Sequence, residues 1–357
     1  MQRNFKIDFL RRVIVDWYKV QENNLDKLRF PGLSENSYSL RNKLRERYLS
    51  FRRAAKILSN SEDLAWVYEK LEDEESRKNL IALLAYRSLG HAHVKLLQNT
   101  PKYWQYVETV ARELTVSTGI AEAKVIGTLN EYDLTKCDFL IRLLAHPLNV
   151  LNTFLLQQYR LVHSNRTIEV QPGDVVIDAG ACFGDTSLYF SEKVGVNGAV
   201  YAYEFDPDNL VLFRKNMEIN AAIAGRVHLQ EYAVWNKAGE QLRFLTNGPS
   251  TRLVTENEES NFLTTTDTID ELVDRIGLNR LNFIKMDIEG AELEALQGAE
   301  RSIRKFTPNL AISIYHRPEH FWLVQRYIDS LNLGYKFFIE HFTIHCEETM
   351  LFASVSQ

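Results

Sequence analysis

The chain has 357 residues, of which 45% are hydrophobic and 25% charged, and its formal net charge is −5. That length is sufficient for two domains with a sizeable core, and the composition is typical of a globular protein. The acidic balance argues against a dedicated nucleic-acid partner, because nucleic-acid binders carry a basic excess. No stretch approaches the roughly 20 apolar residues of a membrane span, and the N-terminus shows no signal-peptide core.

The three cysteines, Cys137, Cys182 and Cys346, lie far apart and form no C-x-x-C pair. An odd number of isolated cysteines favours a reducing compartment and gives no structural zinc site. We therefore expect a cytoplasmic protein.

Residues 1 to about 150 are expected to form a helical N-terminal domain. Apolar residues recur at helical spacing in 40–58, 64–71 and 77–97, the pattern of amphipathic helices. Gly32, Gly90 and the pair Thr100-Pro101 interrupt this pattern, and residues 120–145 contain short β-prone pieces. The sequence does not indicate what this domain does.

From about residue 165 the pattern alternates between strands and helices. Apolar β-prone runs predict strands at 175–177, 200–203, 227–229, 281–286, 310–315, 335–339 and 350–353, with a β excursion at 242–245 and a polar loop at 247–261. Asp206-Pro207 and the capping-box pattern from Thr268 to Glu271 predict helix starts. Such alternation predicts a mostly parallel sheet with helices on both faces, and the closing strands fit an antiparallel hairpin.

The most informative segment is residues 174–186, where an apolar run ends in Asp178 and is followed by a loop with Gly180 and Gly184. A helix is expected to begin at Asp185 or Thr186. A parallel sheet presents nucleotide-like cofactors in this way. The loop lacks the full glycine set of a dinucleotide fingerprint, and its two acids would repel a pyrophosphate. They suit the ammonium and sulfonium groups of S-adenosylmethionine, so we favour this cofactor over NAD.

The next predicted strand ends at Glu204, 24 positions after Gly180. Similar folds place a carboxylate near this distance to bind ribose hydroxyls. Phe205 is expected to lie against an adenine ring, and Ala233 follows the third strand, where a small residue suits the adenine. The alternative for Glu204 is an exposed acid at a strand end.

Two later strand ends carry ionisable side chains. Asp287 and Glu289 follow the fourth predicted strand, and His316 follows the fifth. Ligands of open α/β sheets sit beyond the carboxyl ends of the strands, so we expect these groups to converge on the crevice opened by Gly180. Glu292 is interpreted as an acid in the first turn of a helix, where it favours the helix dipole.

Residues 153–354 resemble the FkbM-type methyltransferases, which use S-adenosylmethionine. The matching segments are 158–159, 173–181, 184–186, Glu204, 284–292 and 310–317, and the string from Lys285 to Glu292 (KMDIEGAE) is the most specific of them. The resemblance implies a Rossmann-like, seven-stranded methyltransferase sheet over 151–357, mostly parallel with an antiparallel last strand. It also implies O-methylation of a small-molecule or carbohydrate hydroxyl, without naming the acceptor.

These observations define the candidate site. The expected cofactor-binding residues are Tyr159, Asp178, Gly180, Ala181, Gly184, Asp185, Thr186, Glu204, Phe205, Asn209, Ala233 and Asp287. The expected acceptor-side residues are His316, Arg317 and His341.

Methyl transfer to a hydroxyl requires removal of a proton. His316 is the candidate general base, because imidazole titrates near neutral pH, with Asp287 and Glu289 orienting it or the acceptor. Alternatively, Asp287, Glu289 and His316 hold Mg²⁺ or Mn²⁺, which lowers the pKa of the hydroxyl. A nicotinamide-dependent oxidoreductase and a non-catalytic scaffold are the rival functions, and a homo-oligomer is left open.

Overall fold

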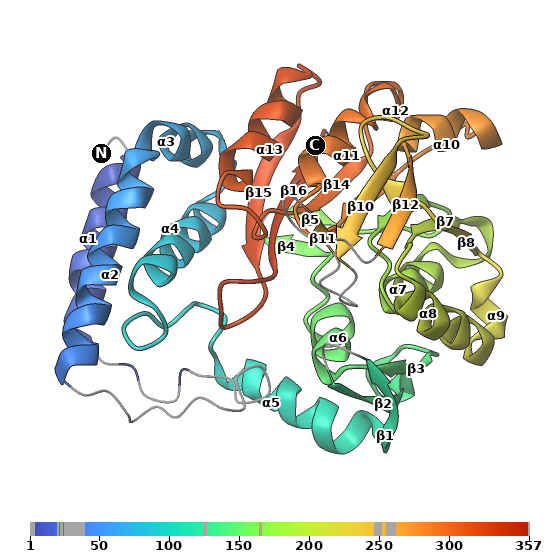
Figure 1. Cartoon of the computed structure of the whole chain (residues 1–357), viewed down its shortest axis with the longest axis horizontal. Helices are drawn as coiled ribbons and strands as arrows, with labels where there is room; N and C mark the ends of the chain where they lie inside the picture. Colours follow the sequence, from blue (N-terminus) through green and yellow to red (C-terminus); the bar gives the residue numbers. More distant parts are fainter. Residues whose placement is uncertain are drawn as a thin grey trace. The chain divides into compact units, whose positions relative to one another are not determined.

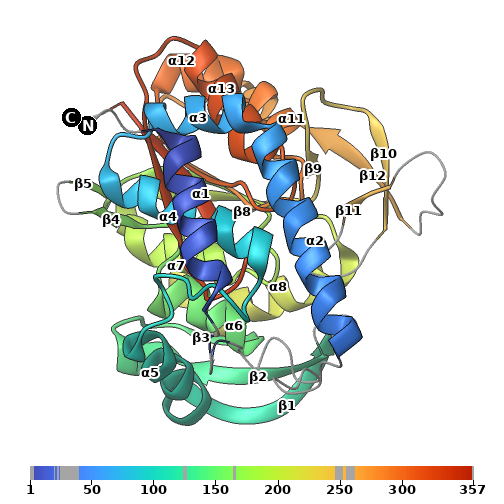
Figure 2. The ribbon, with the colours of Figure 1, turned by 90° about the vertical axis from the view of Figure 1, so that its left-hand side faces the viewer.

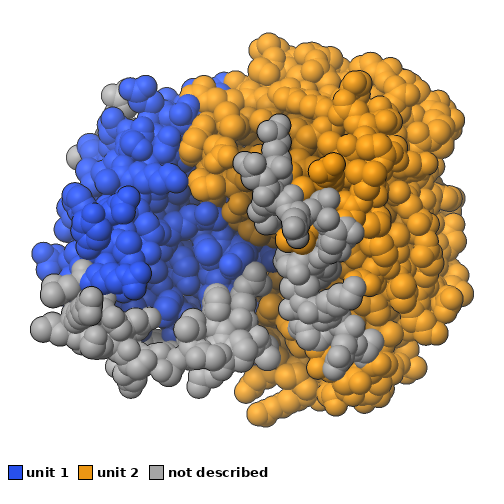
Figure 3. Space-filling model, in the orientation of Figure 1, with its two compact units in different colours: residues 1–104, 336–349 blue, residues 105–335, 350–357 orange. Residues whose placement is uncertain are grey.

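The computed structural model describes residues 4–19, 21, 24, 40–123, 127–163, 166–245, 252–254 and 262–355. The chain divides into two compact units, residues 1–104 with 336–349 and residues 105–335 with 350–357 (Figure 3). The boundary expected near residue 150 thus falls inside the second unit. The expected polar loop at 247–261 lies outside the described residues except for 252–254, which include the short strand β11 (Arg252–Leu253).

The first unit is built on helices α1 (Phe5–Trp17), α2 (Leu40–Ser59), α3 (Ser61–Lys70) and α4 (Glu74–Leu89). The periodicity predicts the last three of them. Both α1 and α2 pack on α4, whose side chains are buried on nearly every face (Figures 1 and 2). Asp73 caps the start of α4 through the backbone N–H of Ser76. The expected helix over 77–97 ends earlier, at Leu89, because Gly90 adopts a φ of +79° that ends the helix.

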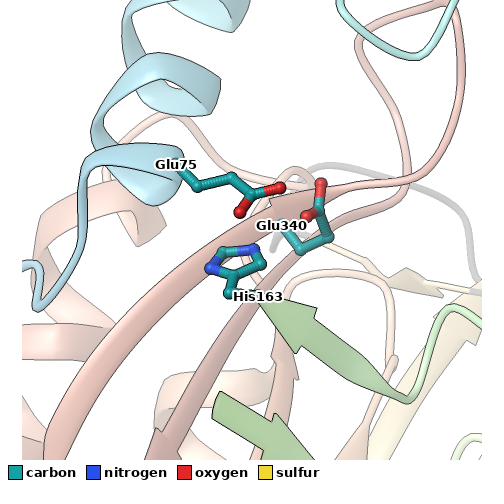
Figure 4. Close-up of side chains that lie close together, drawn as sticks. All are labelled: Glu75, His163 and Glu340. Carbon is teal, nitrogen blue, oxygen red and sulfur yellow. The ribbon is translucent and has the colours of Figure 1, made fainter. Parts of the chain in front are cut away.

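Strand β15 (Lys336–His341) also belongs to this unit and carries Glu340. The Glu340 side chain points toward that of Glu75 on α4 (Figure 4). One Glu340 oxygen accepts hydrogen bonds from Asn79 Nδ2 at 2.9 Å and Gln98 Nε2 at 3.3 Å. Glu340 is therefore fixed by side chains of its own unit.

The second unit begins with elements that the sequence places in the helical domain. They are α5 (Pro101–Thr109), whose first residues fall in the first unit, β1 (Thr115–Ala123), β2 (Gly127–Asp133), β3 (Arg142–Ala145), α6 (Pro147–Val150), β4 (Leu161–His163) and β5 (Arg166–Ile168). Strands β1, β2 and β3 form an antiparallel sheet. The β-prone pieces expected at 120–145 therefore belong to these three strands.

The central sheet has seven strands in the order β15-β16-β14-β13-β6-β7-β8. Its remaining members are β6 (Val175–Ala179), β7 (Ala199–Tyr203), β8 (Val227–Gln230), β13 (Phe283–Met286), β14 (Asn309–Ser313) and β16 (Thr349–Ser354). Strands β8, β7, β6, β13 and β14 are parallel, and β16 is antiparallel to β14. All seven predicted strands are confirmed. The strand order reverses between β7 and β13 on the two sides of β6, which is where such sheets bind ligands.

Helices connect the parallel strands: α7 (Asp185–Val194), α8 (Pro207–Ile219), α9 (Ala221–Ala224), α10 (Ile269–Ile276), α11 (Glu292–Gln297), α12 (Glu300–Phe306) and α13 (His320–Ser330). Figure 1 shows α7 and α8 beside β7 and β8. The predicted caps are confirmed, since Asp206 accepts from the N–H groups of Asp208 and Asn209, and Thr268 accepts from that of Glu271. None of the helices in the described part of the chain has the length and apolar character needed to cross a membrane.

A smaller sheet interrupts the alternation, in the order β11-β10-β12-β9. It comprises β9 (Ala233–Val234), β10 (Gln241–Leu245), β11 and β12 (Phe262–Asp267). The predicted excursion at 242–245 is β10. This sheet matters for function because Ala233, Val234 and Phe244 on its strands line the pocket described next.

Candidate functional site

A pocket opens where β6, β7 and β13 end. Seven expected site residues line it: Gly180, Glu204, Phe205, Asn209, Ala233, Asp287 and Glu289. The sequence analysis missed eight further lining residues: Cys182, Tyr203, Tyr232, Val234, Trp235, Phe244, Ile288 and Ala291. The structure thus brings the first glycine loop, the end of β7 and the end of β13 to a single cavity.

Gly180 lets two strand ends approach each other. Its φ is +82°, and a Cβ at this position would lie 1.9 Å from the carbonyl oxygen of Asp287. The N–H groups of Gly180 and Ala181 donate to the carbonyl of Tyr203 at 3.1 and 2.9 Å. Glycine is required here both for the left-handed backbone and for the close packing. Gly184, with a φ of +80°, precedes the first residue of α7, as expected.

Asp178 does not line the pocket. It is fully buried, and Lys285 Nζ lies 3.0 Å from its Oδ1 while Thr186 and Ser187 donate to its Oδ2 at 2.7 and 2.6 Å. Lys285 also donates to the carbonyls of Ala179 and Gly180 at 3.1 and 2.6 Å. The β6–β13 register places Lys285 directly opposite Asp178. The charge of Asp178 is therefore balanced by Lys285 inside the protein. The hydrogen bonds from Lys285 to the carbonyls of Ala179 and Gly180 hold the glycine loop in place.

Asp185 likewise points into the fold. Its Oδ2 accepts from Thr153 at 3.1 Å and from Asn149 at 3.4 Å. Burial raises the pKa of Asp185 to about 6, although Lys285 opposes this shift. Of the two loop acids expected to face a cationic ligand, neither lines the pocket.

Glu204 lies at the pocket wall in a fixed orientation. Its Oε1 accepts from the backbone N–H groups of Phe205 and Asp206 at 2.7 and 2.8 Å, and its Oε2 accepts from Asn209 Nδ2 at 3.2 Å. Burial raises the pKa of Glu204 to about 7, although these hydrogen bonds oppose the shift. The Oδ1 atom of Asn209 is buried and has no hydrogen-bond partner among the described residues, so it is an acceptor left available to a ligand.

Aromatic side chains form the apolar part of the pocket. The ring centroids of Phe205 and Phe244 lie 4.5 Å apart, and Phe205 also stacks at 6.3 Å with Phe262. Tyr203, Tyr232 and Trp235 complete the aromatic lining. The only sequence signal for Phe244 was the β excursion that contains it, and that pattern does not show that the strand returns to the pocket.

Three carboxylates surround His316. Its Nδ1 lies 2.8 Å from Glu292 Oε1, and its Nε2 lies 3.4 Å from Asp287 Oδ1 and 3.7 Å from Glu289 Oε2. The Nε2 atom is buried without a hydrogen-bond partner among the described residues. One ligand-type atom from each of Asp287, Glu292 and His316 lies within 4.8 Å of the others, a group able to hold a metal ion. The expected trio therefore converges, and Glu292 joins it.

Electrostatics favour the protonated ring of His316. Burial alone would lower its pKa, but Glu292, then Asp287 and Glu289, raise it to about 10. With no cation in the cluster, the ring therefore carries a proton at neutral pH and has no free lone pair with which to act as a base. Opposite charges within a few ångströms produce a shift in this direction.

The remaining expected residues lie around this cluster or away from it. Tyr159 donates its hydroxyl to Asp287 Oδ2 at 3.2 Å. Arg317 lies beside Gly290, where a Cβ would meet its Nε at 2.8 Å. His341 belongs to the first unit and is buried, with Nδ1 2.9 Å from Thr349 Oγ1 and Nε2 2.7 Å from the carbonyl of His345. Both ring nitrogens of His341 are thus engaged within its own unit.

Comparison with known proteins supports the fold and shows one match to a family model. Residues 178–341 match the family model described as the methyltransferase FkbM domain. Among solved structures, a methyltransferase FkbM from Methylobacillus flagellatus KT is similar, with a TM-score of 0.54 and 20% identity over 84% of this chain and 60% of that one. This chain therefore spans less than two thirds of the length of that protein. No curated protein matches the chain.

Two further structures are similar at lower scores. Aeropyrum pernix fibrillarin, solved with natively bound S-adenosyl-L-methionine, has a TM-score of 0.35 and 12% identity over 67% of this chain and 98% of its own. A putative O-methyltransferase from Klebsiella pneumoniae has a TM-score of 0.34 and 12% identity over 73% of this chain and 93% of its own.

The seven-stranded sheet with its antiparallel β16, and the pocket at the carboxyl ends of β6 and β7, define a protein of the methyltransferase fold. More particularly, residues 178–341 match the model of the methyltransferase FkbM domain. The matching model describes a methyltransferase domain, and not a nicotinamide-dependent oxidoreductase.

Proposed function

We propose that this protein transfers a methyl group from S-adenosylmethionine to a hydroxyl of a small molecule or carbohydrate. The observation that carries the proposal is the composition of one pocket. Glu204 and Phe205 line it together with Asp287 and Glu289, and the buried Nε2 of His316 faces that second pair. A cofactor-binding end and an ionisable end thus share a single cavity.

The pocket residues fit the proposed cofactor. A carboxylate fixed by two backbone N–H groups is suited to accept hydrogen bonds from ribose hydroxyls. The unpartnered Oδ1 of Asn209 offers a further buried acceptor, and the aromatic wall around Phe205 suits a planar base. When bound, S-adenosylmethionine supplies a methyl group on a cationic sulfonium. Asp287 and Glu289 are the pocket carboxylates that would face this charge, because Asp178 is occupied by Lys285.

At the acceptor end, the protein must orient a hydroxyl and favour the loss of its proton. His316 Nε2, Asp287 and Glu289 converge there. With no cation present, the ring is held protonated and can hydrogen-bond to an acceptor oxygen. A divalent cation on Asp287, Glu289 and His316 would displace that proton and lower the pKa of a bound hydroxyl. Base catalysis by His316 requires the same proton to leave the ring.

Replacing His316 with glutamine is expected to lower methyl transfer by about 10²–10⁴-fold, with little change in affinity for S-adenosylhomocysteine. The assay follows labelled methyl from S-adenosylmethionine onto a panel of monosaccharides and small hydroxylated acceptors, with product masses determined. His93→Gln, in the first unit, is the control and should keep full activity. Loss of activity on chelation, restored by Mg²⁺ or Mn²⁺, identifies the cation route, and activity that survives chelation identifies a route without a cation, in which the protonated ring of His316 hydrogen-bonds to the acceptor oxygen. Transfer to nitrogen or carbon would contradict O-methylation.

Cofactor affinity should depend on pH through Glu204. Its pKa is about 7 in the free protein, and ribose hydroxyls bind the ionised carboxylate best. At pH 6 only about a tenth of the molecules carry that form, so S-adenosylhomocysteine should bind roughly tenfold more weakly at pH 6 than at pH 8. Calorimetry in two buffers of different ionisation enthalpy should detect proton release at pH 6. Glu204→Gln should flatten the pH profile, and a profile unchanged in this variant would assign the pH dependence to another group.

A further inference from the structure

Glu292 is the first residue of α11, yet its side chain turns inward instead of toward solvent. It is fully buried, and its Oε1 accepts from the backbone N–H groups of Ile288 and Gly290 at 3.1 and 3.3 Å. The same oxygen lies 2.8 Å from His316 Nδ1. Its second oxygen, Oε2, lies 3.1 Å from Nδ1 of His320. Glu292 therefore links two histidines while the chain between β13 and α11 fixes it in place.

This arrangement determines what His316 presents to Asp287 and Glu289, which line the pocket. An ionised carboxylate only accepts hydrogen bonds, so Nδ1 of His316 must be the donor. The other ring nitrogen, Nε2, then faces Asp287 and Glu289. A carboxylate that holds one imidazole nitrogen fixes the tautomer and the orientation of the ring, and thereby the properties of the other nitrogen.

His320 extends the same chain. It is the first residue of α13 and is buried. Its position beside Oε2 restrains the free rotation of the Glu292 carboxylate, which would otherwise let Oε1 leave His316. Close buried polar contacts of this kind restrict the side chains that form them to one geometry.

We propose that Glu292 and His320 are positioning residues, and that the chain His320–Glu292–His316 aims Nε2 of His316 at the acceptor end of the pocket. This rests on the proposed function, in which His316 acts at that end. Neither residue nor His316 itself lines the pocket, but Nε2 of His316 lies beside the lining residues Asp287 and Glu289. Glu292 and His320 therefore act through His316. The sequence interpretation of Glu292 as a helix-dipole acid is thereby extended to a specific role.

The first test is spectroscopic and needs no acceptor. In protein labelled with ¹⁵N-histidine, the Nδ1–H of His316 should give a slowly exchanging, low-field signal that His316→Gln removes. Glu292→Gln should shift this signal or abolish it through exchange, because a neutral amide is a weaker acceptor. Glu294→Gln, on the same helix, is the matched control and should leave it unchanged. A signal indifferent to Glu292→Gln would overturn the proposal.

The second test separates positioning from a general effect on folding. Glu292→Gln should lower kcat by about 10–100-fold, while KM and the affinity for S-adenosylhomocysteine stay within about twofold. In a His316→Gln background the same change should cost almost nothing, because the two residues act as one unit. Equal losses in both backgrounds would contradict the proposal. If the wild-type protein transfers no methyl group, the proposed function fails, and the spectroscopic result still decides the positioning role.

A second pair of variants covers the case in which Glu292→Gln does not fold. His320→Asn keeps a donor near the position of Nδ1, whereas His320→Phe removes it. We expect the asparagine variant to retain the His316 signal and most of kcat, and the phenylalanine variant to lose both while still binding S-adenosylhomocysteine. Identical behaviour of the two variants would show that His320 contributes only volume.

Discussion

Replacing Gly180 with alanine should abolish measurable binding of S-adenosylhomocysteine and lower the free energy of unfolding by roughly 2–5 kcal/mol. A Cβ would lie 1.9 Å from the carbonyl oxygen of Asp287 and 2.9 Å from its carbon. Both are backbone atoms, and the backbone N–H of Asp287 donates a hydrogen bond to the carbonyl of Ala179 at 3.1 Å. Relief of the clash therefore requires β6 and β13 to separate at the pocket. Urea unfolding and calorimetry measure the two effects.

Gly277 provides the matched control for this substitution. It also has a positive φ, +65°, but nothing lies within 4 Å of its Cβ position. Gly277→Ala should therefore show only the backbone cost of about 1–2 kcal/mol and should retain full cofactor affinity. Equal effects at the two positions would show that the close contact with Asp287 is not what requires glycine at position 180.

Replacing Lys285 with methionine should destabilise the protein by about 3–5 kcal/mol, because it leaves Asp178 buried without its counter-charge. It also removes the hydrogen bonds to the carbonyls of Ala179 and Gly180, so the remaining folded protein should bind S-adenosylhomocysteine more weakly. Denaturant unfolding followed by calorimetry tests both expectations.

Two controls isolate the buried pair. Adding Asp178→Asn to Lys285→Met should recover much of the lost stability, because the uncompensated charge is gone while the acceptor for Thr186 and Ser187 remains. Lys336→Met breaks an ion pair between Lys336 and Glu72, both largely exposed, and should have an effect within about 1 kcal/mol. If the double variant is no more stable than Lys285→Met, the account of Asp178 and Lys285 as a charge-compensated pair is wrong.

Local patterns in the sequence were sufficient to predict the elements of the central sheet. Alternating apolar runs located its seven strands, and capping residues such as Asp206 and Thr268 located helix starts. The glycine loop and Glu204 were also predicted from short-range spacing, and the structure places both at the pocket. These signals work because each depends on residues close together in the chain.

The parts that sequence could not reveal depend on pairing between distant strands. Asp178 was interpreted as a ligand-facing acid because it stands with Asp185 in the glycine loop. Its actual partner, Lys285, is distant in the chain and is brought opposite by the β6–β13 register. Phe244 reaches the pocket only because β10 pairs with β12, which in turn pairs with β9. Glu292 was explained by its position in the first turn of a helix, where an acid favours the helix dipole. That local explanation gave no reason to expect its contacts with His316 and His320.

The measurement that tests the central claim most directly is a calorimetric titration of the purified protein with S-adenosylhomocysteine at pH 8, beside NAD and a Glu204→Ala variant. The account predicts micromolar binding of S-adenosylhomocysteine, a loss of at least tenfold in the variant, and no binding of NAD. Binding of NAD, or S-adenosylhomocysteine affinity that is unchanged in Glu204→Ala, would contradict the assignment of this pocket as the cofactor site of a methyltransferase.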